Sequence, residues 1–221
     1  MGYRLGSKDV KLNRKRMSKI ATGKNGDVYR YHNMALKIFR KSDTPMSVET
    51  ADYLTTISTN RVLLPKKLLF YNHAFKGYSY TLVSKKGATK KIIELPKGEF
   101  IDNIILLEND IERLSKRNVL LNGVDFSNTI FNGRLYMTDP SQYSVLDIAP
   151  IEELERLNKY QLHLLLTSII IADIRKSSDL CNYEKLIREL LAEKDDIEDS
   201  SYFFDNMIGK KDSIKEYVKS L

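Results

Sequence analysis

The chain has 221 residues, 42% of them hydrophobic and 10% aromatic, which allows one large domain or two small lobes with a real core. Its net charge of +7 hides an asymmetry: residues 1–100 carry 21 Lys and Arg against 7 Asp and Glu, and residues 101–221 carry 15 against 22. The single cysteine excludes an internal disulfide, and the longest apolar run, residues 162–174, is too short to span a bilayer. We therefore expect a protein of a reducing, cytoplasmic compartment without a transmembrane segment.

The basic first half attracts phosphate groups of any kind, in a nucleotide, a nucleic acid or an anionic lipid. Its densest basic stretch lies within residues 8–19. A run of this kind is more often a solvated face than a binding site, so a nucleic-acid partner is disfavoured.

Short strands are the first predicted elements. Residues 18–40 alternate strand-like and turn-like segments and predict three strands joined by two turns. Residues 44–58 predict a helix, which the β-branched run at its end would fray. Residues 66–75 and 78–83 predict a strand pair joined by a turn at Lys76-Gly77.

Helices dominate the second half. Apolar residues at helical spacing predict a helix over residues 100–116, a hairpin follows over 128–139, and residues 151–177 and 182–194 are helical by periodicity and propensity. The fold class is therefore α+β, with two lobes. The expected domains are a β-rich N-terminal lobe over 1–84, a Gly-containing charged linker over 85–91 and a mainly helical C-terminal lobe over 92–221.

A glycine-containing turn lies between the first two of the three predicted strands. Gly23, Gly26 and Val28 give the spacing G-x-x-G-x-V, and Ala21 stands where a first glycine of G-x-G-x-x-G-x-V would be. Glycines let backbone amides approach phosphate oxygens that a Cβ would keep away.

The third strand contains a lysine. Met34, Leu36 and Ile38 share one face of the segment "MALKIF", so Lys37 points to the other face together with Ala35. A lysine there is either a point charge for phosphate or an ordinary solvated strand lysine.

The hairpin "NTIFNGRLYMTD" ends in polar side chains. If Asn132-Gly133 forms a two-residue turn, Asn128 faces Met137, and Asp139 lies on the same face as Asn128 at a diagonal of roughly 7 Å. An amide oxygen and a carboxylate at that separation suit a shared hard cation such as Mg²⁺. The same residues also suit an exposed hairpin whose ends carry polar caps.

Together these segments resemble the protein kinase family. "ATGKNGDVY" is similar to its Gly-rich loop, "MALK" to V-A-I-K, and the hairpin to the catalytic-loop Asn followed by strands that end in the Asp of D-F-G, in the same order over residues 18–140.

The resemblance implies roles for individual residues. Lys37 would contact the α and β phosphates of ATP, Glu49 would be the helix carboxylate that pairs with Lys37, and Asn128 and Asp139 would hold Mg²⁺. Leu82 and Val83 would end the strand that leads to the hinge. The nucleotide site implied in this way consists of Ala21, Gly23, Gly26, Val28, Ala35, Lys37, Glu49, Leu82 and Val83.

Three departures from the family pattern concern catalysis. The position of the catalytic Asp, five residues before Asn128, is Gly123, so Asp125 is either a displaced base or a turn-stabilising residue. Asp139 is followed by Pro140 and Ser141 in place of Phe-Gly. No A-P-E motif follows, so an activation segment is nearly absent, as in minimal kinases of bacteria and bacterial effectors.

The expected function is an ATP- and Mg-dependent kinase that transfers the γ-phosphate to a protein Ser or Thr hydroxyl, with Lys37, Asp125 and Asp139 as catalytic residues. The alternatives are a pseudokinase that binds nucleotide or a protein partner without catalysis, and a small-molecule kinase of the same fold. The protein would work in the cytoplasm, or in a host cytosol if it is a delivered effector. The sequence predicts no oligomeric state.

Overall fold

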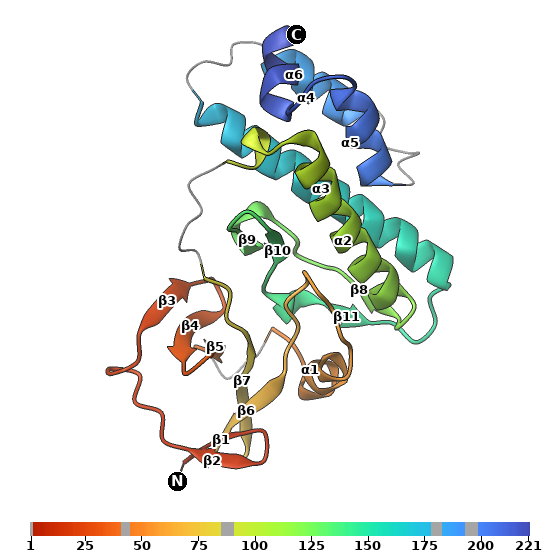
Figure 1. The fold of residues 1–221 in the computed structure, drawn as a ribbon. Coiled ribbons are helices and arrows are strands. Elements are labelled where there is room, and N and C mark those ends of the chain that lie inside the picture. The colour runs from red at the N-terminus through yellow and green to blue at the C-terminus, as the bar shows by residue number, and fades with distance from the viewer. Residues whose placement is uncertain (1, 41–44, 85–90, 178–182, 193–198) are drawn as a thin grey trace. The chain divides into compact units, whose positions relative to one another are not determined.

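The structure is a computed structural model that describes residues 2–40, 45–84, 91–177, 183–192 and 199–221. Its contacts divide the chain into two units. The sheet unit consists of Met1–Thr59, Leu63–Ser84 and Thr138–Ser144, and the helical unit of Asn60–Val62, Lys85–Met137 and Val145–Leu221. The fold is thus α+β, with a sheet-rich first part and a helical second part (Figure 1). The predicted linker lies outside the described residues except for Lys91.

The sheet unit is built on one antiparallel sheet of order β2-β1-β6-β7-β5-β4-β3 (Figure 1). One helix, α1, follows β5 in the chain. A short 3₁₀ turn, η3, lies in the segment Thr138–Ser144 of this unit. The elements are β1 (Tyr3–Leu5), β2 (Lys8–Val10), β3 (Lys19–Thr22), β4 (Gly26–Tyr31), β5 (Met34–Phe39), α1 (Val48–Thr55), β6 (Lys67–Tyr71), β7 (Ala74–Thr81) and η3 (Pro140–Gln142).

The 25-residue helix α3 forms the centre of the helical unit. Its residues Leu162, Leu166 and Ile170 are fully buried. None of the described helices is long and apolar enough to cross a membrane. The elements are η1 (Ile92–Glu94), α2 (Lys97–Ser115), β8 (Val119–Leu120), η2 (Phe126–Asn128), β9 (Thr129–Phe131), β10 (Leu135–Met137), α3 (Ile151–Arg175), α4 (Tyr183–Ala192), α5 (Ser200–Ile208) and α6 (Ile214–Ser220). The short strand β11 (Ser144–Val145) begins at the last residue of the sheet unit and ends in the helical unit.

Most predicted elements are confirmed, with shifted ends. The three strands over 18–40 are β3, β4 and β5, and the helix over 44–58 is α1, which begins where the Ser47 side chain accepts a hydrogen bond from Thr50 N and ends at Thr55. The helices predicted over 100–116, 151–177 and 182–194 are α2, α3 and α4.

The turn predicted at Lys76-Gly77 is wrong. The chain turns at Asn72 and His73, whose φ angles of 47° and 68° are the two positive values that a two-residue type I′ hairpin needs. Gly77 lies inside β7, where a Cβ would stand 2.0 Å from the carbonyl oxygen of Lys37. It is a glycine because two strands approach closely there, and not because the chain reverses.

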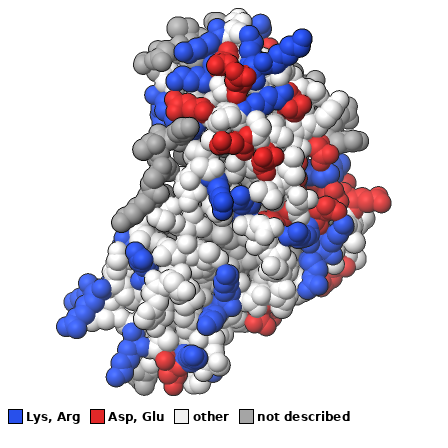
Figure 2. Space-filling view, in the orientation of Figure 1, with Lys and Arg blue, Asp and Glu red and all other residues white. Residues whose placement is uncertain are grey.

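The basic stretch near the N-terminus is part of the sheet. β1 pairs with β6 and β2 with β1, and Leu12 and Met17 pack against a core cluster that includes Leu36 and Leu69. The cations of this stretch are mostly exposed, and Lys and Arg side chains are prominent on the visible face of the sheet unit (Figure 2).

A buried carboxylate explains why Asn60–Val62 belongs to the helical unit. Asp110 in α2 is fully buried and accepts hydrogen bonds from three successive backbone amides, those of residues 60–62, at 2.5–3.1 Å. Each amide would otherwise be an unsatisfied donor in the interior, so this contact fixes the segment on α2.

The helical core also holds an imidazole. His163 in α3 is 2% exposed, stacks on Phe204 and meets Phe203 edge to face, and neither ring nitrogen forms a hydrogen bond of ordinary geometry within the described residues. Burial lowers the pKa of His163, and the nearby backbone of Leu190 opposes this only in part.

We expect stability to fall on acidification because of His163. Its pKa is lower in the folded than in the unfolded chain, so the unfolded chain binds more protons and stability is lost as the pH falls below the ordinary histidine value of about 6.5. His163→Leu should remove this dependence and raise stability at pH 7.5 by about 1 kcal/mol. The check is urea unfolding of both proteins from about pH 7.5 to 5.5. Parallel curves would contradict the assignment.

Candidate functional site

Lys37 lies in β5, between β4 and β7, and its backbone is packed closely against both strands. Its cross-strand neighbours are Val28 in β4 and Tyr78 in β7. Glycines allow the close approach: a Cβ on Gly26 would stand 2.5 Å from the Ile38 carbonyl oxygen, and one on Gly77 would stand closer still to the carbonyl oxygen of Lys37 itself. The position of the Lys37 backbone is therefore set by the sheet.

The predicted faces of β5 are confirmed. Leu36 and Ile38 belong to a buried cluster against which Met34 packs, and Lys37 is not part of that cluster. Lys37 is only 2% exposed, so it is not the solvated strand lysine that the sequence allowed.

The ammonium group of Lys37 forms an ion pair with Asp139, a residue 102 positions later in the chain. Lys37 Nζ also donates to Ser141 Oγ at 3.3 Å. Both acceptors come from the segment Thr138–Ser144, which is part of the sheet unit. The buried lysine, the aspartate and the serine thus form one polar cluster within a single unit.

The turn at Asp139 has an unusual backbone. Asp139 adopts the left-handed conformation, with φ 62° and ψ 65°, and caps η3, whose first residue is Pro140. Its Oδ1 accepts a hydrogen bond from Ser141 N at 3.3 Å. The left-handed region is uncommon for a residue other than glycine, although Asp and Asn enter it more readily than most. The cap and the proline ring hold the carboxylate in place.

The two charges of the pair respond differently to their surroundings. Burial, the largest effect, lowers the pKa of Lys37, and Asp139 compensates only in part. Burial would raise the pKa of Asp139, but the Lys37 charge and the hydrogen bonds from Lys37 and Ser141 outweigh it and lower that pKa. Burial thus decides the pKa shift of Lys37 but not that of Asp139. This agrees with their exposure, since 3% of the Lys37 side chain but 25% of the Asp139 side chain is exposed.

Three tyrosines surround the carboxylate. Tyr78 donates to Asp139 Oδ1 at 3.4 Å, and burial together with the Asp139 charge raises the pKa of Tyr78, Tyr80 and Tyr143. All three therefore remain neutral hydroxyls at physiological pH.

The predicted glycine turn connects β3 and β4. Gly23 N donates to Gly26 O at 2.9 Å, Ala21 pairs with Val28 across the hairpin, and Ala35 is buried in β5. Gly26 is required by sheet packing, whereas a Cβ on Gly23 would make only an ordinary contact at 3.6 Å. The exposed residues of this turn are open to a ligand.

The predicted pairing of Glu49 with Lys37 is absent. Glu49 in α1 is exposed and lines a pocket of about 530 Å³ together with Lys66 and Lys67, and in the described part of the chain it forms no ion pair with Lys37. Asp139 takes the place at the ammonium group that the resemblance gave to Glu49.

The register of the hairpin is shifted from the prediction by one residue. Of the two turn residues only Gly133 has a positive φ, 87°, so the loop contains three residues, Asn132 to Arg134, and Leu135 pairs with Phe131. A shift of one residue exchanges the two faces of a strand, so the argument that placed Asn128 and Asp139 on one face is wrong. Asn128 belongs to the helical unit and Asp139 to the sheet unit. A shared ion stays a prediction from the family resemblance.

Asp125 is the cap of a short turn. Its Oδ1 accepts hydrogen bonds from both Ser127 N and Ser127 Oγ, and it begins η2. Asn128 ends this turn and donates from Nδ2 to Gly123 O at 3.1 Å. The turn-stabilising role is therefore present, and the Asp125 side chain is exposed.

Two buried asparagines, not singled out from the sequence, support this loop and hairpin. Asn158 in α3 accepts from Leu121 N at 2.8 Å and donates to Val119 O and Ser115 Oγ. Asn103 in α2 accepts from Leu135 N at 2.8 Å. Each is a polar residue on the apolar face of a predicted helix, and that pattern is the signal that could have identified them.

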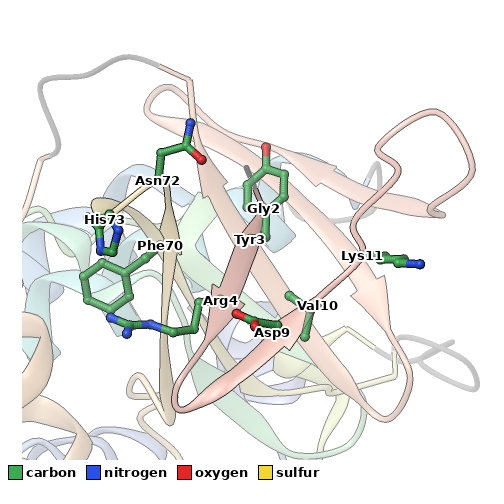
Figure 3. Close-up of a pocket in the computed structure, with 9 residues that line it drawn as sticks. All are labelled: Gly2, Tyr3, Arg4, Asp9, Val10, Lys11, Phe70, Asn72 and His73. Atoms are coloured by element: carbon green, nitrogen blue, oxygen red, sulfur yellow. The ribbon is translucent and has the colours of Figure 1, made fainter.

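Leu82 and Val83, which were predicted to lead to a hinge, follow β7, which ends at Thr81, and both are half-buried. Another hollow, of about 600 Å³, lies at the edge formed by β1, β2 and β6 (Figure 3). There the Arg4 guanidinium lies 5.2 Å from the centre of the Phe70 ring, and Asp9 of β2 stands opposite Arg4 of β1 in the strand register. Its charges are of both signs, and none of the residues predicted for the nucleotide lines it.

The oxygen ligands of this site fit Mg²⁺ only if water or substrate phosphates complete its coordination. Among the residues that the structure describes, no group of three or more His, Cys, Asp or Glu could hold a metal ion. Mg²⁺ commonly takes one or two protein groups, with water and substrate phosphates as its other ligands. The partly exposed carboxylate of Asp139 is a suitable protein ligand of this kind.

No protein-family model and no curated protein matches the chain.

We expect Asp139→Asn to destabilise the protein by about 3 kcal/mol, because it leaves the Lys37 charge buried without a counter-charge. Asn retains the left-handed backbone and the cap. The double variant Lys37→Met/Asp139→Asn should recover most of the loss, since it removes the buried charge itself. The measurement is the free energy of unfolding in urea. If the loss in the double variant equals the sum of the losses in Asp139→Asn and Lys37→Met, the two residues are not coupled.

Asn158→Leu should cost about 2–3 kcal/mol, because Leu121 N and Val119 O would become unsatisfied in the interior. It should also loosen the loop around Asp125 and Asn128. Hydrogen exchange of the amides in residues 119–128 would report this directly. Unchanged protection there, with normal stability, would exclude the supporting role of Asn158.

Proposed function

We propose that this protein binds ATP with Mg²⁺ and transfers the γ-phosphate to a Ser or Thr hydroxyl of a protein, as an atypical minimal member of the protein-kinase-like superfamily. The proposal depends on one observation above the others. Lys37 and Asp139, chosen separately from two motifs as the phosphate-binding and metal-binding residues, form an ion pair in the folded chain.

The arrangement of the sheet unit supports the proposal. A glycine-containing turn joins β3 and β4, the lysine lies in the next strand, β5, and helix α1 follows before β6 and β7. This is the order of Gly-rich loop, strand lysine and helix in protein kinases. In the helical unit the loop with Asn128 follows helix α2 and precedes the β9–β10 hairpin, again in the family order.

Each residue would act through charge and position. Lys37, fixed by the sheet, would bind phosphate oxygens as a point charge. Asp139 would become a metal ligand and give up part of its contact with Lys37, which frees the ammonium group for the nucleotide. Mg²⁺, when bound, neutralises charge on the phosphates. Gly23 and its neighbours would cover the phosphates with backbone amides.

The transfer itself needs little from a base. The acceptor oxygen forms a bond to the γ-phosphorus, the bond from that phosphorus to the bridging oxygen of ADP breaks, and the hydroxyl proton passes to the Asp125 carboxylate or to water. Because phosphoryl transfer depends chiefly on positioning and charge neutralisation, Gly123 in place of the usual Asp lowers the rate without abolishing it.

The alternative is a pseudokinase, favoured by the capping role of Asp125. The Asp125 carboxylate already accepts two hydrogen bonds from Ser127, so it would have to give up part of this cap to accept the proton of a hydroxyl group. In that case nucleotide binding would persist and phosphate transfer would not, and the protein would act on a binding partner.

We expect wild-type protein to bind a fluorescent ATP analogue in the presence of Mg²⁺ and to transfer labelled γ-phosphate to itself or to a generic protein substrate. Lys37→Met should reduce both by at least about tenfold, through the loss of a charge-assisted contact. Lys67→Met is the matched control, because Lys67 is an exposed strand lysine of the same unit and should leave both unchanged.

Asp125→Asn separates the two functions. A fall in the rate of transfer with unchanged nucleotide affinity would support Asp125 as the base. Binding without transfer in every protein would support the pseudokinase. Wild-type protein that is folded and binds no nucleotide would refute both.

A further inference from the structure

Ser141 connects the two charged residues of the site. It is 1% exposed, its Oγ accepts a hydrogen bond from Lys37 Nζ at 3.3 Å, and its backbone amide donates to Asp139 Oδ1 at 3.3 Å. One residue thus contacts the cation through its side chain and the anion through its backbone.

The geometry gives the hydroxyl a distinct task. An ammonium group has three N–H donors and no acceptor, and among the described residues Asp139 and Ser141 accept hydrogen bonds from that of Lys37. If the carboxylate turns to a divalent cation, the hydroxyl is the acceptor from the protein that stays with the ammonium group. The ring of Phe39, with its centre 5.9 Å from Nζ, adds a weak attraction from the side.

We propose that Ser141 is a positioning residue, which holds the Lys37 ammonium group in place for the nucleotide phosphates when Asp139 binds the divalent cation. This inference depends on the proposed nucleotide site. Pro140 contributes by restricting the backbone of the turn, which fixes the backbone positions of Asp139 and Ser141 on the same short segment.

The proposal implies a dependence on metal. Without Mg²⁺, Asp139 holds Lys37 whether or not the hydroxyl is present, so loss of the hydroxyl should matter little. With Mg²⁺ the hydroxyl becomes the main support of Lys37, and its loss should weaken nucleotide binding. If Ser141 served only packing, loss of its hydroxyl would change the nucleotide affinity equally with and without Mg²⁺.

The chain offers a matched control in Ser79 of β7. It is fully buried in the same sheet, on the strand next to β5, and its Oγ has no hydrogen-bond partner within the described residues. Removal of that hydroxyl leaves no donor unpaired. Ser79→Ala therefore tests the effect of deleting a buried serine hydroxyl from this sheet without touching Lys37.

The experiment is titration of a fluorescent ATP analogue into wild type, Ser141→Ala, Ser141→Thr and Ser79→Ala, each with Mg²⁺ and with a chelator. Ser141→Ala should lose about tenfold in affinity with Mg²⁺ and less than about twofold without it, the size expected for one hydrogen bond to a charged group. Ser141→Thr keeps the hydroxyl and should restore binding, and Ser79→Ala should match wild type. Melting temperatures measured without nucleotide show that each variant is folded.

Wild-type affinity of Ser141→Ala in Mg²⁺, or an equal loss with and without the metal, would overturn the positioning role while the proposed function stands. Wild type that binds no nucleotide would refute the proposed function, and the inference with it. If Ser141→Thr is folded and binds as poorly as Ser141→Ala, the hydroxyl is not the group that matters.

Discussion

The buried ammonium group of Lys37 is the constraint on which the sheet unit depends. Removing a charge from water costs several kcal/mol, and the cost is offset only by a well-placed counter-charge with further hydrogen bonds. Asp139 and Ser141 supply both, and they come from the segment Thr138–Ser144, far from the rest of the sheet in sequence. A protein that needed only stability could place an apolar side chain here at no loss. A buried charge at this position is therefore an argument for the proposed nucleotide site rather than for stability alone.

Much of this site could be predicted from the sequence because its signals are local. The alternation of β5 showed which face Lys37 takes, and the motif order drew attention to Asp139. The contact between them could not be derived, since nothing in either segment specifies a partner 102 residues away. The resemblance instead assigned Glu49 to Lys37, and the helix that carries Glu49 packs with that side chain exposed.

The wrong local predictions share a cause: turn chemistry was inferred from dipeptides. Asn132-Gly133 suggested a two-residue turn, but Asn132 keeps a negative φ and the loop takes a third residue. Lys76-Gly77 looked like a turn because glycines often mark one, whereas Gly77 serves the approach of β7 to β5. The supporting roles of Asn158 and Asn103 could not be predicted for a related reason. Their partners are backbone groups of remote segments, and a helical pattern alone does not show which polar residue on an apolar face has such a partner.

The division of the chain has a consequence for its synthesis. The sheet unit takes in Thr138–Ser144, so a nascent chain has produced all seven strands long before the counter-charge of Lys37 leaves the ribosome. At roughly 5–20 residues per second, the interval between Ser84 and Asp139 lasts several seconds. Any sheet that forms in that time lacks the carboxylate and the hydroxyl that Lys37 contacts in the finished chain. The segment that completes this unit is thus made only after residues 85–137 of the helical unit, and a fragment that stops at residue 84 would lack it altogether.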